Sequence, residues 1–172
     1  MPVIIRDARD SDAEPLIALI GGCFAEYPGC ILDVDGEIPE LRAIATFFRQ
    51  HDGCFWIAEE DAQVVGSVGV LPAHHPQGIE LRKLYVAKTA RRQGLGSKLC
   101  DLAEATAQAR GVAFIELWSD TRFLDAHRLY ERRGYERGRE TRLLYDVSQT
   151  VEYYFRKPLP CATSSPISRG LD

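Results

Sequence analysis

The sequence lacks the features of membrane-spanning, secreted and nucleic-acid-binding proteins. No apolar run among its 172 residues is long enough to cross a bilayer, so we expect no membrane association. The first ten residues, MPVIIRDARD, carry an acidic residue at their short apolar patch, which argues against a signal peptide. The net charge is −4, whereas nucleic-acid binders usually have a basic excess, so a nucleic-acid partner is not expected.

The chain also lacks a cysteine pattern that would indicate a disulfide framework or a zinc site. The five cysteines are an odd number, widely scattered, and contain no CxxC pair; they are Cys23, Cys30, Cys54, Cys100 and Cys161. Such usage is typical of a reduced chain. We therefore predict a cytoplasmic protein with no metal site.

Apolar residues make up 45% and charged residues 27% of the chain, as in ordinary soluble globular proteins. The length suits one domain with its own core. We expect this domain over residues 1–158, and the Pro- and Ser-rich segment 159–172 as a tail.

Apolar spacing along the chain predicts helices interleaved with strands. Strands are expected at 3–6, 54–60, 64–72, 79–87, 112–118, 136–145 and 151–157. Helices are expected from residue 11, around 41–48, and at 97–110 and 123–133, with Gly21 and Gly22 ending or kinking the first. The order predicts an α/β layered domain with a central sheet.

The stretch RRQGLGSKL, residues 91–99, places a glycine turn between a predicted strand and a predicted helix. The first amides of a helix have no intrahelical partner and carry partial positive charge, so they bind anions. Gly94 and Gly96 remove side chains that would hold a phosphate away, and Arg91, Arg92 and Lys98 add charge.

Three phosphate-binding patterns compete for this turn. The pattern GxxxxGK[ST] is absent, and GxGxxG fails because Leu99 replaces its third glycine. The pattern [QR]xxGx[GA] fits Arg91, Gly94 and Gly96. By itself it is short, and a purely structural turn explains it equally well.

The flanking sequence favours the anion site. ELRKLYVAKTARRQGLGSKLCDLAEATAQARG, followed by IELW and AHRLYERRGY, resembles the acetyl-CoA-binding core of the GNAT superfamily of N-acetyltransferases over residues 80–135. The resemblance implies the GNAT fold, with a central, mixed and splayed sheet of six to seven strands and about four flanking helices. It also implies acetyl-CoA as co-substrate.

The resemblance implies where acetyl-CoA would bind. Its pantetheine arm would lie in a V-shaped gap between strands 79–87 and 112–118, and the amides of residues 93–97 would hold its pyrophosphate. Asp120 stands where relatives often have a pantetheine-binding asparagine, and the aspartate departs from that pattern. The expected cofactor-binding residues are Leu84, Tyr85, Val86, Arg91, Arg92, Gln93, Gly94, Leu95, Gly96, Ser97, Asp120 and His127.

Acetyl transfer to an amine needs a base to take the amine proton. Glu80 is the expected base, because many relatives place a carboxylate there; the alternative is that it pairs with Arg82. Glu116 is a second candidate, and His74 and His75 have suitable pKa values.

The leaving thiolate of coenzyme A needs an acid, and Tyr130 is the expected one. It stands where the family commonly has a tyrosine that faces the coenzyme sulfur. The alternative is that its ring only packs beside Phe123 and His127.

The acceptor is expected to be a primary amine of a small molecule or peptide. The loop between the first two helices is acidic and would attract a cationic amine, unless its charges are simply solvated: Glu26, Asp33, Asp35, Glu37 and Glu40. Four aromatic residues also stand where they could line an acceptor pocket or pack in the sheet: Tyr27, Trp56, Tyr153 and Tyr154.

Three alternatives stay open. One is an acyl-CoA-binding sensor or interaction module without turnover. Another is a nucleic-acid-directed acetyltransferase, which needs one continuous basic surface from the arginines of residues 128–142. The third concerns assembly, since strand 151–157 offers an edge for a homodimer.

Overall fold

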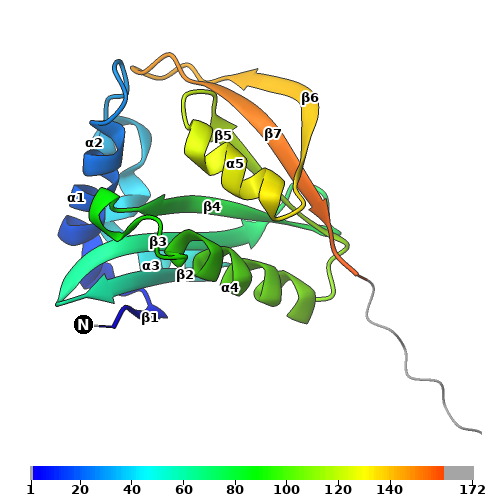
Figure 1. Cartoon of the computed structure of the whole chain (residues 1–172), viewed down its shortest axis with the longest axis horizontal. Helices are drawn as coiled ribbons and strands as arrows, with labels where there is room; N and C mark the ends of the chain where they lie inside the picture. The colour runs from blue at the N-terminus through cyan, green and yellow to red at the C-terminus, as the bar shows by residue number, and fades with distance from the viewer. Residues whose placement is uncertain (1, 161–172) are drawn as a thin grey trace, which may run out of the picture.

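The structure is a computed structural model that describes residues 2–160. Its centre is a seven-stranded sheet in the order β1-β2-β3-β4-β5-β7-β6 (Figure 1). Neighbouring strands are antiparallel except β4 and β5, which are parallel. The strands are β1 (Ile4–Asp7), β2 (Cys54–Glu60), β3 (Gln63–Pro72), β4 (Gly78–Val86), β5 (Phe114–Asp120), β6 (Glu136–Leu143) and β7 (Val151–Pro158).

Helices cover both faces of the sheet. The α-helices are α1 (Ala13–Phe24), α2 (Val34–Glu37), α3 (Ile44–Gln50), α4 (Leu95–Ala109) and α5 (Leu124–Arg132). Three short 3-10 segments accompany them: η1 (Asp10–Asp12), η2 (Pro39–Ala43) and η3 (Lys88–Ala90). Figure 1 shows α4 and α5 on one side of the sheet, and α1, α2 and α3 grouped together at the left of the view.

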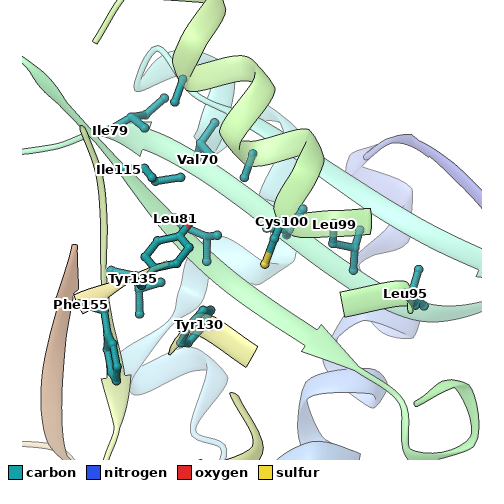
Figure 2. Packing of buried hydrophobic residues seen from close by; sticks show 14 of the residues in the cluster. Val70, Ile79, Leu81, Leu95, Leu99, Cys100, Ile115, Tyr130, Tyr135 and Phe155 are labelled. Atoms are coloured by element: carbon teal, nitrogen blue, oxygen red, sulfur yellow. The ribbon is translucent and has the colours of Figure 1, made fainter. Parts of the chain in front are cut away.

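Two hydrophobic cores follow from this layering. Apolar residues of α1, η2 and α3, among them Leu16, Leu41 and Phe48, pack against one face of β2 and β3. The larger core joins α4 and α5 to the other face (Figure 2), where Leu99 and Phe155 are fully buried. Alternate residues of β4 and β5 therefore face different layers, as the period of a strand requires.

The parallel pairing of β4 and β5 is short, and this opens the sheet. Only three residue pairs join the two strands, and the last of them is Glu80 with Glu116. Beyond it lies a β-bulge: between the pairs Gly69–Arg82 and Ser67–Tyr85, one residue of β3 faces two of β4. The C-terminal half of β4 thus diverges from β5 with one edge unpaired.

These observations confirm the predicted α/β class and the mixed, splayed central sheet. The expectation that Gly21 and Gly22 end the first helix is wrong, because α1 continues through both to Phe24. Helix α2 was not predicted, since its four residues show no apolar period. Leu159 is buried and donates its amide hydrogen to the carbonyl of Ala113, while residues 161–172 of the predicted tail lie outside the described residues.

Candidate active site

A cavity of about 520 Å³ lies at the opening between β4, the start of α4 and helix α5. Its floor is the last part of β4, and the loop and first turn of α4 form one wall. Nine of the predicted cofactor-binding residues line it: Leu84, Tyr85, Val86, Arg91, Arg92, Gly94, Leu95, Gly96 and Ser97. The structure thus brings the strand and the glycine turn to one cavity.

Both glycines of the turn have a structural reason to be glycine. Gly94 is the N-cap of α4 and has φ +78°, a left-handed conformation that costs other residues free energy. A Cβ on Gly96 would lie 3.1 Å from Leu129 Cδ2, so α5 could not approach α4 as closely. No side chain caps the helix, which leaves its first amides directed at the cavity.

The guanidinium of Arg91 already has partners inside the protein. It donates to both carboxylate oxygens of Glu26, at 2.7 and 2.6 Å, and its Nε donates to the carbonyl oxygen of Val86 at 2.9 Å. Arg91 therefore joins the end of α1 to the cavity floor. Arg92, Arg128 and Arg132 supply further positive charge to the cavity lining.

Asp120 and His127 lie outside the cavity lining, and internal hydrogen bonds hold both. Asp120 forms a salt bridge to Arg122 at 2.8 Å and is buried. His127 Nε2 donates to the carbonyl oxygen of Asp120 at 2.9 Å and lies 3.1 Å from Ser119 Oγ. Burial lowers the pKa of His127, so its imidazole is neutral near pH 7. Both residues orient the chain between β5 and α5.

Gln93, the remaining predicted cofactor contact, also lies outside the lining. Its side-chain amide donates to the carbonyl oxygen of Thr89 at 3.4 Å, which steadies the turn. Its backbone belongs to the turn that precedes α4.

Tyr130 lies on α5 and is not among the residues that line the cavity. Its ring packs with Tyr135 and Phe155, with centroid distances of 5.6 Å to each, and only 4% of the residue is exposed (Figure 2). Burial raises its pKa, so the phenol keeps its proton at neutral pH. The position is compatible with both alternatives, a proton donor and a packing residue.

Glu80 lies at the point where β4 and β5 separate. It faces away from α4, its side chain is 19% exposed, and Arg82 Nε lies 3.9 Å from its carboxylate. Burial raises the pKa of Glu80, and the opposing effect of Arg82 is smaller. Its neighbour Glu116 differs, because the hydroxyl of Tyr154 donates a hydrogen bond to it. Glu80 is thus the carboxylate that is freer to accept a proton.

The histidine alternatives are less well placed. His74 and His75 are exposed in the loop before β4, at the end of the strand opposite to Leu84–Val86. His75 accepts a hydrogen bond from the amide of Gln77 at 3.2 Å.

Most carboxylates of the acidic loop have partners inside the protein. Glu26 pairs with Arg91, as described above. Asp35 pairs with Arg42 at 3.0 Å and Glu40 with Lys83 at 3.1 Å. Asp33 and Glu37 accept hydrogen bonds from the amides of Gly36 and Val147. Three of the five charges are thus paired with cations, whereas Asp33 and Glu37 keep their negative charge.

The cavity also contains residues that sequence reasoning did not assign to the cofactor. Cys23 and Tyr27 come from the end of α1, and the ring of Tyr27 lies 4.9 Å from that of Phe123. Ala126 and Leu129 come from α5, one turn apart. The helical spacing 125, 128, 129, 132 identifies the face of α5 that lines the cavity, but α1 has no comparable signal.

Comparison with known proteins identifies the class. A family model described as "Acetyltransferase (GNAT) family" matches residues 18–135, and this chain belongs to that family. A curated relative, "Probable N-acetyltransferase camello" of Xenopus tropicalis, is 33% identical over 114 residues. That match covers 63% of this chain and 52% of the relative, so the chain spans about half of the relative's length.

Solved structures share the fold. An acetyltransferase of the GNAT family from Staphylococcus aureus Mu50 superimposes with a TM-score of 0.79 at 23% identity, covering 92% of this chain and all of that one. The PaiA N-acetyltransferase from Thermoplasma acidophilum, solved in complex with coenzyme A, gives 0.71 at 17% identity over 92% of this chain and all of that one.

Two further properties concern the described part of the chain, residues 2–160. None of its helices combines the length and apolarity that crossing a bilayer requires. No group of three or more metal-ligating side chains is found in it.

Proposed function

We propose that this protein is an N-acetyltransferase that moves the acetyl group of acetyl-CoA to a primary amine. The observation that carries the proposal is the cavity formed by the unpaired end of β4 and the uncapped first turn of α4. Free strand edges pair with extended amide chains, and helix N-termini bind phosphates. Pantetheine diphosphate offers both groups in one molecule.

In the proposed complex, the diphosphate binds the amides of residues 94–97, with Arg92 nearby. The pantetheine arm lies along Leu84–Val86. One of these amides donates a hydrogen bond to the thioester oxygen, where negative charge develops during transfer.

Transfer is proposed to proceed directly within a ternary complex. Glu80, directly or through water, takes a proton from the ammonium group of the acceptor. The neutral nitrogen attacks the thioester carbon, the C–N bond forms, and the C–S bond breaks. Tyr130 gives its proton to the leaving sulfur. The attacking nitrogen becomes positively charged as the C–N bond forms and loses its second proton, which passes through water to the Tyr130 phenolate, while Glu80 releases its proton to solvent. No enzyme-bound acyl intermediate is required.

The second candidate is an acyl-CoA-binding module of the same fold without turnover. The buried position of Tyr130 keeps this candidate open, since the ring also packs in the core. Glu80 favours the enzyme, because a partly buried carboxylate with a raised pKa suits proton transfer.

The experiment that separates the two candidates is thiol release from acetyl-CoA with a panel of primary amines. The enzyme predicts release that depends on the amine, with a matching mass gain in that amine. Binding of acetyl-CoA without any amine-dependent thiol would leave only the module. Glu80→Gln serves as the control for uncatalysed aminolysis.

The cytoplasm remains the proposed compartment. The four cysteines of the described residues are free thiols, which supports it. The expectation that strand 151–157 offers a free edge is wrong, because β7 pairs with β5 on one side and with β6 on the other. A homodimer is likewise a proposal, now through β6, which is the strand at this edge of the sheet.

A further inference from the structure

We infer that the buried ion pair between Lys83 and Glu40 is a positioning device for the proposed acetyl transfer. It holds the bulge of β4 in the shape that presents the amides of Leu84–Val86 to the thioester. The inference rests on the proposed function, and Lys83 and Glu40 touch neither the acceptor nor the cofactor in it.

The first step concerns where the bulge lies. Val68 of β3 faces both Lys83 and Leu84 of β4, since the flanking pairs are Gly69–Arg82 and Ser67–Tyr85. The bulge therefore lies at the start of the strand segment that forms the cavity floor. Loss of the bulge would shift the pairing of this segment with β3 by one residue and exchange the faces of Leu84, Tyr85 and Val86.

The second step concerns the conformational free energy of the bulge. Lys83 has φ +53°, a left-handed conformation that a residue with a Cβ adopts rarely. Such a residue persists only where its surroundings hold it. One stabilising contact is a hydrogen bond to the backbone: the hydroxyl of Ser67, a fully buried residue, donates to the carbonyl oxygen of Lys83 at 2.8 Å.

The third step concerns the side chain. Lys83 Nζ lies 3.1 Å from Glu40 Oε1, and the two side chains are only 11% and 13% exposed. Burial lowers the pKa of Lys83, and Glu40 opposes this effect only in part. A buried ammonium is costly without its carboxylate, so the pair fixes where Lys83 points.

The fourth step connects two regions. Glu40 belongs to η2, between α2 and α3, whereas Lys83 belongs to β4. The ion pair is thus a link between the loop region before α3 and the strand that would bind the thioester. A neighbouring pair on the same segment, Arg42 with Asp35, is exposed and does not reach β4.

The test uses the full chain and needs no identified acceptor. Affinities for acetyl-CoA and for coenzyme A are measured by calorimetry. The carbonyl stretch of bound [13C]acetyl-CoA is measured by infrared difference spectroscopy, because a hydrogen bond to the oxygen lowers its frequency. The variants are Lys83→Met, Glu40→Gln, the double variant Lys83→Met/Glu40→Met, and Lys83→Arg. Arg42→Met is the matched control.

The expected result is a selective loss. In Lys83→Met and Glu40→Gln, the carbonyl frequency moves toward its value in water, while coenzyme A affinity stays within about threefold. Lys83→Arg restores most of the frequency shift, and Arg42→Met changes nothing. The double variant keeps the fold, because two apolar side chains replace both charges, but it does not restore the shift.

Two results would overturn the inference. One is an unchanged carbonyl frequency in Lys83→Met. The other is a parallel loss of coenzyme A affinity and thermal stability with no selective effect on the acetyl group, which would make the pair merely structural. Failure of the wild-type protein to bind acetyl-CoA at all would instead reject the proposed function.

Discussion

At the residue scale, the same burial has opposite consequences for the two proposed catalytic groups. It raises the pKa of both, which keeps the Tyr130 phenol protonated and moves the Glu80 carboxylate toward neutrality. A general acid or base works best when its pKa lies near the working pH. The shift of Glu80 therefore favours its role as base, whereas the shift of Tyr130 makes the phenol a weaker proton donor than an ordinary tyrosine.

Replacing Tyr130 by Phe removes one hydroxyl and keeps the ring that packs with Tyr135 and Phe155. We expect turnover to fall at least about tenfold, because the leaving sulfur loses its proton donor. Affinity for acetyl-CoA should stay nearly unchanged, as measured by calorimetry beside steady-state kinetics. Equal turnover at saturating substrate would leave Tyr130 with packing alone.

Protonation of Glu80 should determine the acid side of the pH–rate profile. Its raised pKa means that the carboxylate stays protonated, and inactive as a base, to a higher pH than an ordinary glutamate. Activity should therefore rise with pH through that raised value. Arg82 on the same strand and Arg142 on β6 oppose the shift, whereas Glu116 on β5 and Glu152 on β7 add to it.

In Glu80→Gln we expect this acid limb to vanish and turnover to fall about 100-fold or more. Glu116→Gln is the matched control, and it should keep the limb because Tyr154 already occupies its carboxylate. The opposite pattern would transfer the role of base to Glu116.

Individual roles were the hardest part to predict from sequence. The partner of Arg91 is Glu26, which lies 65 residues away in the sequence. Glu40 of η2 pairs with Lys83 of strand β4. Sequence shows such charges but not their pairing, so the acidic loop looked free when most of it is engaged. The predicted site residues remain predictions, although nine of them meet at one cavity.

At the scale of elements, strands and helices could be predicted from sequence where a single apolar period dominates the segment. The strands and helix α4 were predicted within a few residues, because apolar spacing and the Gly111 stop determine them. Gly21 and Gly22 misled the prediction, since packing of Leu19, Ile20 and Cys23 in the core keeps α1 helical past both. The bulge in β4 gave no signal, because it arises from pairing with β3.

The two ends of α4 offer a matched pair of glycines, Gly94 before the helix and Gly111 after it. Gly94 and Gly111 both have positive φ, at +78° and +69°, and open space where a Cβ would point. Alanine at either should cost about 1 kcal/mol of unfolding free energy. Only Gly94→Ala should also weaken acetyl-CoA binding, because its methyl group stands at the phosphate position. Calorimetry beside urea unfolding measures both effects, and equal affinities would remove the turn from the site.

At the scale of the whole molecule, the sheet is two parts joined over three residue pairs of β4 and β5. The class of fold followed from the order of elements, but the splay depends on contacts between distant segments. A ligand in the gap would touch β4, α4 and α5 at once. Binding of such a ligand should therefore link the two parts of the sheet and raise the free energy of unfolding.

This arrangement predicts a thermal shift. A ligand at 100 times its dissociation constant adds about 2.7 kcal/mol to the free energy of unfolding, which for this size raises Tm by about 5–10 °C. Coenzyme A should produce the shift, and adenosine, which lacks both diphosphate and pantetheine, should not. An equal shift with adenosine would place the binding energy elsewhere.

The most direct test of the central claim is a crystal structure of the protein with acetyl-CoA. We predict the diphosphate on the backbone amides of residues 94–97 and the pantetheine arm between the separated ends of β4 and β5. A gap left empty at millimolar acetyl-CoA, or the cofactor bound at another face, would contradict the account.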